Sequence, residues 1–517
     1  MSFVIKASAE RPGDDESFKA LLVSQCQQLT KCWQHFYATR LAELPAAHLT
    51  TLRIAASALP DYRMHLNYLN ARVRDNDGVN PDDNSILFIR LNRGGKELGG
   101  EELIFSLFKS AFPAAKDAVE NAASGFLAPS RLFSLLVRLV ASDGDPANLA
   151  NGISLQSFKT KIKDLEFKGQ LDDFIHNRVA KIMDKARDLL TGPHVYSLPS
   201  ALATRTIRNA PNAFLAMLYW LNKGGGVDAN SSEHRSLLAV FTVVSWFSPG
   251  NNNQQGENLA TWMKATKSSP LDEFWSPKHI WPLFIQSEDP IPIFPDPVQL
   301  KDFLEQTVVN DANYNWETLG ATCPYHAVFD GYTRLPNPEI MPVAKHPDEQ
   351  TSTPRQLVLQ ANLREFVGML SSNYNMLLFA QREFITRAFG EFQQWDVVLD
   401  DTNAPWDWDH IYPSASGRHN VYPTYRAWHD KIGNKRVEEL SSNRSNGDSA
   451  PKVKLADEKT RKDSFISEEI WGLIQQVSPS IKDEANARLL CRINVRRMAE
   501  IYAEWHNVLH IGDLVKP

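Results

Sequence analysis

Residues that could hydrolyse a phosphodiester bond lie between positions 405 and 454. The stretch 405–413 reads PWDWDHIYP and places Asp409 directly before His410. A neutral imidazole can accept a proton from water near neutral pH, so His410 suits the role of general base. Asn434 follows in the stretch IGNKR, and its amide can hold the imidazole in a productive orientation. His410 and Asn434 are therefore the predicted catalytic residues.

Oxygen donors for a hard divalent cation accompany this pair. Asp409 offers carboxylate oxygens and Asn443 an amide oxygen, ligands that suit Mg²⁺, with Mn²⁺ as the alternative ion. The bound ion would stabilise the leaving oxyanion. Three nearby cations could neutralise the scissile phosphate, namely Arg444, Lys452 and Lys454. The pattern predicts metal-dependent hydrolysis of a nucleic acid.

The local charge agrees with that substrate. Between positions 411 and 464, eleven Lys and Arg residues stand against seven Asp and Glu residues, whereas the whole chain has a formal charge of −6. A phosphate backbone requires a confined basic patch of this kind. A lone Asp-His pair would more often be a structural hydrogen-bonded pair, and it is the ordered set with both asparagines that favours catalysis.

The other aromatic and histidine residues of this region have simpler expected roles. Packing is favoured over base stacking for three aromatic residues, Trp406, Trp408 and Tyr412. His419 and His429 stand in a turn-rich loop, and we expect both to be exposed to solvent.

The ordered residues resemble a nuclease family. Asp-His-Ile-Tyr-Pro, Ile-Gly-Asn and a final Asn are similar to the HNH nucleases of the ββα-metal type, in the variant whose last histidine is replaced by asparagine. The resemblance implies that His410 is the base and that Asn434 orients it. It also implies that Asp409 and Asn443 hold the metal. More narrowly, LLFAQREFI before this segment and ARLLCRINVRRMAEIYAEWHNVL after it resemble the C-terminal nuclease of GmrSD-type modification-dependent restriction proteins.

An upstream stretch resembles a second domain of the same proteins. Residues 86–112 read ILFIRLNRGGKELGGEELIFSLFKSAF and are similar to part of the ParB-like domain that precedes the nuclease. Arg90 and Asn92 match that segment and are candidates for contact with a nucleotide or with DNA. The family's Asp-Gly-Gln-Gln-Arg motif has no intact copy here, so we expect a partner chain to supply it, or the nucleotide site to be lost. The isolated chain is expected to hydrolyse neither ATP nor GTP.

Helical periodicity dominates the elements that must position these residues. The predicted fold is mainly α, a helical multi-domain chain with a partial ParB-like α/β N-terminal region and a small ββα-metal (HNH) module embedded in C-terminal helices. The predicted domains are 1–125 (incomplete ParB-like domain), 126–350 (helical middle domain) and 351–517 (nuclease domain, with its ββα core at about 404–465). Apolar residues recur at helical spacing in the stretches 18–37, 46–69, 103–112, 129–140, 155–190 and 355–393.

The combined expectation is a metal-dependent endonuclease of a prokaryotic restriction or anti-phage defence system that cuts double-stranded DNA, including modified DNA. The alternative is a non-catalytic DNA-binding or scaffold subunit, because asparagine in place of the final histidine gives a different ligand set. The four cysteines lack Cys-x-x-Cys spacing, and the N-terminus has no long apolar stretch. These features predict a cytoplasmic protein without structural zinc and without a membrane segment.

Overall fold

The computed structural model describes residues 14–26, 45–54, 100–142, 149, 152–247, 270–276, 294–305, 366–390, 406–413, 428–439, 449–477 and 484–515. Of these residues 73% are helical and 4% lie in strands, which confirms the mainly α prediction. None of the helices in these ranges combines the length and the apolar character that a membrane span needs. The predicted ParB-like residues Arg90 and Asn92 lie outside the described residues.

Contacts divide the chain into two compact units. The first contains the described residues up to Val140 and those from Ile153 to Ala180. Its core is aromatic, since the rings of Phe108 and Phe133 stack with centroids 3.9 Å apart. Its helices are α2 (Asp15–Cys26), α6 (Gly100–Ala111), α7 (Lys116–Ala123), α8 (Pro129–Ala141), α9 (Leu155–Lys161) and α10 (Leu165–Asn177). The domain boundary expected after residue 125 falls inside this unit, and the one expected after residue 350 lies outside the described residues.

The second unit holds the described remainder of the chain and includes the candidate site. Its first helices are α11 (Val179–Thr191), α12 (Ser200–Asn209), α13 (Pro211–Asn222), α14 (Ser232–Phe247), η2 (Leu271–Glu273), α17 (Pro297–Phe303), α20 (Tyr374–Ala380) and α21 (Arg382–Phe389). The described segment from residue 406 onward then contains β1 (Trp406–His410), η7 (Ile432–Asn434), β2 (Lys435–Glu439), α25 (Pro451–Lys454), α26 (Glu458–Asp463), α27 (Glu468–Gln476), α28 (Glu484–Val508) and α29 (Ile511–Val515).

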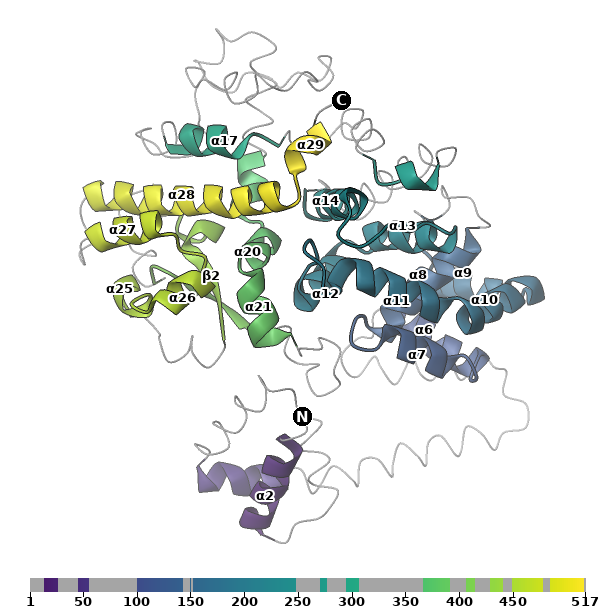
Figure 1. The fold of residues 1–517 in the computed structure, drawn as a ribbon. Coiled ribbons are helices and arrows are strands. Elements are labelled where there is room, and N and C mark those ends of the chain that lie inside the picture. The colour runs from purple at the N-terminus through teal and green to yellow at the C-terminus, as the bar shows by residue number, and fades with distance from the viewer. Residues whose placement is uncertain are drawn as a thin grey trace, which may run out of the picture. The chain divides into compact units, whose positions relative to one another are not determined.

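Helix α28 is the long helix at the C-terminal end of the second unit (Figure 1). It buries side chains along most of its length. Near its C-terminus, the Trp505 indole donates a hydrogen bond to the Thr242 hydroxyl of α14 at 3.1 Å. Near its N-terminus, Leu490 and Ile493 pack into a core cluster with Ile411 and with residues of α27. Helix α28 thus connects the helices of this unit with the segment that contains β1 and β2.

The two strands form an antiparallel pair. The register places Asp409 opposite Arg436 and His410 opposite Lys435. His410 is the last residue of β1, as expected for a histidine that precedes Pro413 by three positions. The side-chain oxygen of Gln381 accepts a hydrogen bond from the Val437 amide at 2.9 Å, so β2 is also tied to the α20–α21 junction.

The Ile-Gly-Asn segment η7 lies directly on α28. A Cβ atom built on Gly433 would stand 2.0 Å from the Asn494 carbonyl oxygen, so only glycine permits this approach. On the next turn of α28, the fully buried guanidinium of Arg497 donates hydrogen bonds to five backbone carbonyls, those of Ile432, Gly433, Lys435, Ser464 and Phe465. A glycine and an arginine thus fix the start of β2 on the long helix.

We predict that Gly433→Ala destabilises the second unit by about 1–3 kcal/mol, the usual cost of overpacking, because η7 must move away from α28. Urea unfolding followed by circular dichroism measures the change. Gly472→Ala is the matched control, since no atom lies within 4 Å of its added Cβ and alanine favours the interior of α27. Equal stability of the Gly433→Ala and Gly472→Ala variants would contradict the close packing.

Candidate active site

His410 stands at the end of β1 within a group of ionisable side chains. Its Nε2 lies 2.8 Å from Asp430 Oδ1, and the Lys435 ammonium lies 2.5 Å from the same nitrogen. The imidazole of His429 stacks on that of His410, with centroids 4.7 Å apart and planes inclined by 21°. We call these four residues, His410, His429, Asp430 and Lys435, the His410 site.

The surroundings favour a neutral His410. Burial lowers its pKa below the usual 6.5, and the charges of Lys435 and His429 act in the same direction, while the hydrogen bond to Asp430 opposes them. A carboxylate can only accept, so a bond to Asp430 places the proton on Nε2 and the lone pair on Nδ1. The Lys435 ammonium lies 3.4 Å from Nδ1 and can donate to it. A water molecule that replaces Lys435 at Nδ1 can give its proton to that nitrogen. Burial also lowers the pKa of Lys435, and the His410 bond lowers that of Asp430.

Asn434 acts on the backbone around the imidazole. Its side-chain oxygen accepts a hydrogen bond from the Tyr412 amide at 2.9 Å. Its side-chain nitrogen donates to the carbonyls of Tyr412, at 3.2 Å, and His429, at 2.9 Å. The residue is fully buried, so these bonds replace all of its contact with water. Asn434 therefore holds the backbone beside both histidines, and its contribution to the orientation of His410 is indirect.

The expectation that His429 is exposed is wrong. Only 5% of the His429 residue is exposed. The Asn434 side chain donates to the His429 carbonyl, and His429 Nε2 donates to the Pro413 carbonyl at 3.2 Å. This bond leaves Nδ1 unprotonated in the neutral ring, 3.6 Å from Asp430 Oδ1. Ligand atoms of His410, His429 and Asp430 lie within 4.8 Å of one another, so the three could hold a metal ion. Two nitrogens and one oxygen suit Mn²⁺ or Zn²⁺ better than Mg²⁺.

Asp409, a predicted metal ligand, is engaged in buried ion pairs. One carboxylate oxygen lies 2.8 Å from Arg436 Nε and the other 2.8 Å from Lys454 Nζ. The Asp409 side chain is only 4% exposed, and Arg436 also pairs with Glu438. The pairing follows from the strand register, which sets Asp409 against Arg436. A metal on Asp409 would have to displace one of these two cations.

Of the two described phosphate-ligand candidates, neither Lys452 nor Lys454 is hydrogen-bonded to the His410 imidazole. Lys454 is bound to Asp409 and to the His410 carbonyl, at 3.0 Å. Lys452 is exposed and donates to the Gln475 carbonyl at 2.8 Å. Asn443 and Arg444 lie outside the described residues, so their roles stay predictions. Within the described part of the site, Lys435 is the cation beside His410.

Asp430 and Lys435 were missed by sequence reasoning. Both belong to the stretch WHDKIGNKR, which also contains Asn434. The sequence signal that could have identified them as site residues was their closeness to this predicted catalytic asparagine. Their proximity to His410 depends on the pairing of β1 with β2, which the residue types do not reveal.

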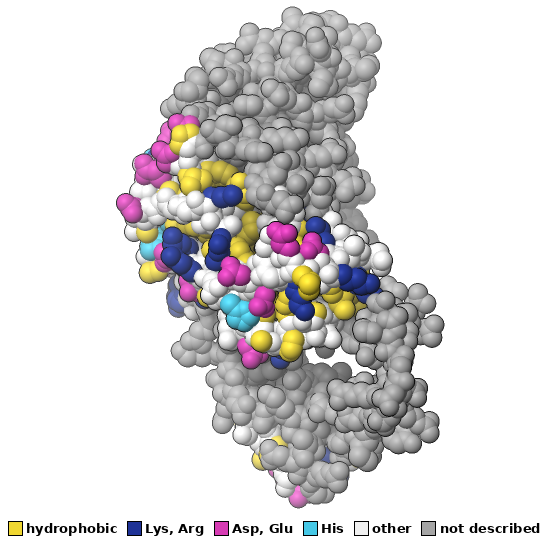
Figure 2. All heavy atoms as spheres, turned by 90° about the vertical axis from the view of Figure 1, so that its right-hand side faces the viewer, with side chains coloured by type: hydrophobic (Ala, Val, Ile, Leu, Met, Phe, Trp, Pro, Cys, Tyr) yellow, Lys and Arg dark blue, Asp and Glu magenta, His cyan; other side chains and the backbone are white. Residues whose placement is uncertain are grey.

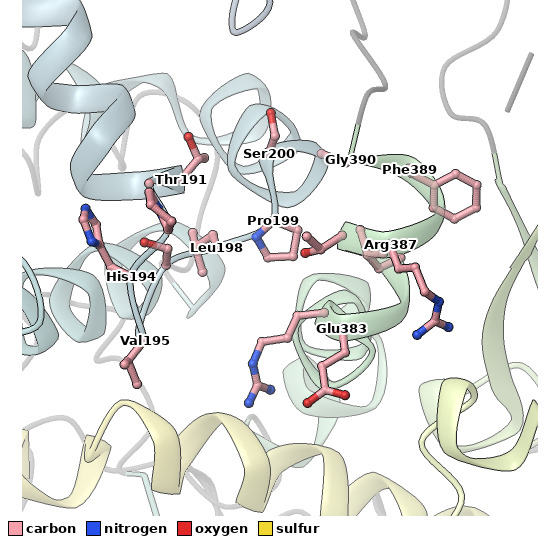
Figure 3. A pocket seen from close by; sticks show the side chains of 17 residues that line it. Thr191, His194, Val195, Leu198, Pro199, Ser200, Glu383, Arg387, Phe389 and Gly390 are labelled. Carbon is pink, nitrogen blue, oxygen red and sulfur yellow. The ribbon is translucent and has the colours of Figure 1, made fainter. Parts of the chain in front are cut away.

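A pocket of about 700 Å³ lies elsewhere in the second unit, between residues 191–201 and α21. Figure 3 shows Leu198 and Pro199 on one side and Glu383 and Arg387 on the other. The Arg387 guanidinium is paired with Asp463 at 2.6 Å, and the pocket lining is largely apolar. None of the four residues of the His410 site lines this pocket, which therefore offers no extension of that site.

Comparisons with protein-family models, with curated proteins and with solved structures each found no match. The likeness to GmrSD-type proteins therefore rests on the quoted motifs. Figure 2 shows one face of the molecule, on which basic and acidic side chains are intermixed among the described residues. The described residues on that face therefore form no continuous basic patch of the kind that binds a phosphate backbone.

We predict that Asp409→Asn destabilises the second unit by about 3–5 kcal/mol, because it leaves the buried cations Arg436 and Lys454 without their shared counter-charge. Urea unfolding in EDTA measures the change. Asp457→Asn is the matched control, since asparagine caps α26 as well as aspartate does. Unchanged stability together with lost metal affinity would instead assign Asp409 as a metal ligand.

Proposed function

We propose that the protein is a metal-dependent HNH-type endonuclease that cuts double-stranded DNA, with His410 as general base. The observation that carries the proposal is the position of the His410 imidazole at the end of β1, 2.8 Å from Asp430 and beside the Lys435 ammonium. The motif resemblance alone supports the remaining parts of this proposal. These are a role in a prokaryotic restriction or anti-phage system, action on modified DNA, a cytoplasmic location and a partner chain that binds a nucleotide.

The chemistry follows from the proton positions. Nδ1 of His410 takes a proton from a water molecule as that water attacks phosphorus, and the Asp430 carboxylate stabilises the imidazolium that forms. Lys435 lies where its charge can offset that of the scissile phosphate. A bound divalent ion would stabilise the leaving oxyanion. Among the described residues, His429 and Asp430 offer donors for that ion without using the lone pair that the base needs.

A second candidate function is a non-catalytic DNA-binding subunit. The observation in its favour is that Asp409 is ion-paired with Arg436 and Lys454. The resemblance to HNH nucleases implies that this carboxylate should bind the metal ion, and the two ion pairs compete with that role. A protein that binds duplex DNA but cuts none with any divalent ion would have this function.

We predict that the wild-type protein nicks or cleaves plasmid DNA with Mg²⁺ or Mn²⁺ and that His410→Ala lowers the rate by about 100-fold or more, the usual contribution of a general base. Unmodified, hydroxymethylated and glucosylated plasmids are assayed side by side on agarose gels. His176→Ala removes an exposed histidine of α10 and serves as the control. Absence of cutting by the wild type on all substrates, or equal cutting by His410→Ala, would contradict the proposal.

The pH dependence of cutting should report the state of His410. The neutral imidazole is the active form, and its pKa is lowered, so the midpoint of the acid limb should lie below pH 6.5. Lys435→Met removes a positive charge that lowers this pKa, so its acid limb should move to higher pH. Lys452→Met, which removes an exposed lysine of α25, should leave the limb in place. Single-turnover rates from about pH 5 to pH 8 test this, and identical limbs in both variants would contradict it.

A further inference from the structure

Three residues from three elements lie together beside the His410 site. They are Arg205 of α12, Tyr374 of α20 and Trp408 of β1. Trp408 precedes His410 by two positions, so both side chains lie on the same face of β1, about 7 Å apart along the strand. Burial raises the pKa of Tyr374, and the charge of Asp430 raises it further, so Tyr374 lies within electrostatic range of the His410 site.

The Arg205 guanidinium is held in a fixed position. Its Nε donates a hydrogen bond to the Asn375 side-chain oxygen at 3.0 Å. Its central carbon lies 5.6 Å from the centroid of a Trp408 ring, within the range of a cation–π contact. The ring of Tyr374 packs against Trp408 with centroids 4.6 Å apart. Trp408 is half-buried, whereas Trp406 and Tyr412 are buried as predicted, so Trp408 retains an accessible part.

The charge of Arg205 lacks a counter-ion in the described part of the chain. Ion pairs there join carboxylates to other arginines of the second unit, including Arg382, Arg387, Arg436 and Arg496, and none of them includes Arg205. Burial lowers the pKa of Arg205, and the nearby charge of Arg208 lowers it further. A partly buried cation beside another cation is costly, and an anion bound at this position would remove that cost.

We propose that Arg205, backed by the Trp408 ring, binds a backbone phosphate of the nucleic-acid strand that His410 cuts, next to the scissile phosphate. The inference rests on the proposed function, since it takes a nucleic acid as the substrate of the site. Phosphates along one strand of a duplex follow at about 3.4 Å of rise, so the roughly 7 Å between Trp408 and His410 along β1 corresponds to a phosphate within about two nucleotides of the scissile one. A planar guanidinium held on an aromatic ring is suited to two parallel bonds with phosphate oxygens.

The test measures binding separately from cutting. Fluorescence anisotropy in EDTA gives the Kd of the full chain for a labelled short duplex at several salt concentrations. Arg205→Gln should weaken binding about tenfold and reduce the slope of log Kd against log salt by about 1, whereas Arg205→Lys should keep the slope. Arg488→Gln removes an exposed arginine that is paired with Glu484, and it should change neither quantity.

A second measurement needs no variant. Phenylglyoxal modifies accessible guanidinium groups, and mass spectrometry of the wild-type chain should show that duplex DNA protects Arg205 but not Arg488. Equal effects of Arg205→Gln and Arg488→Gln, or an Arg205 that DNA leaves unprotected, would overturn the inference even if the protein cuts DNA. Arg205-dependent binding without any cutting would support the phosphate subsite and contradict the nuclease proposal.

Discussion

The buried guanidinium of Arg497 is the interaction on which the candidate site depends. Its hydrogen bonds, between 2.5 and 3.2 Å long, gather the carbonyls of η7, of Lys435 and of the turn after α26 onto one point of α28. Burial lowers the pKa of Arg497, and the carbonyl dipoles compensate by stabilising the charged form. Because a guanidinium presents five donors in a rigid fork, no other side chain could hold all of these carbonyls at once.

The position of His410 depends on Arg497 through a series of contacts. Gly433 allows η7 to touch α28, and Asn434, fixed by that contact, binds the backbone of Tyr412 and His429 on either side of the imidazole. Asp409 then locks β1 to β2 and α25 through its two cations. The base of the site is thus held by buried contacts, while Asp430, which binds His410, keeps a largely exposed side chain.

Local patterns in the sequence predicted much of the fold. The periodic apolar residues of α6, α8, α10, α11 and α21 predicted helices, since each of these helices buries an apolar face. His410 at the end of a strand followed from Pro413. Features set by distant contacts could not be predicted in this way. The burial of His429, the pairing of Asp409 with Arg436, and the approach of Arg205 to Trp408 all depend on strand register or on elements far apart in the chain. Asn443, Arg444, Arg90 and Asn92 stay predictions because they lie outside the described residues.

The central claim is that His410 acts on a phosphodiester bond. A crystal structure of the full chain with Mn²⁺ and a duplex whose scissile phosphate carries non-cleavable phosphorothioate substitutions tests it most directly. The account predicts a phosphorus atom facing Nδ1 of His410 with room for one water between them, and an anomalous Mn²⁺ peak on the leaving-oxygen side. Duplex bound on another surface, with the His410 imidazole out of reach of every phosphate, would contradict the account.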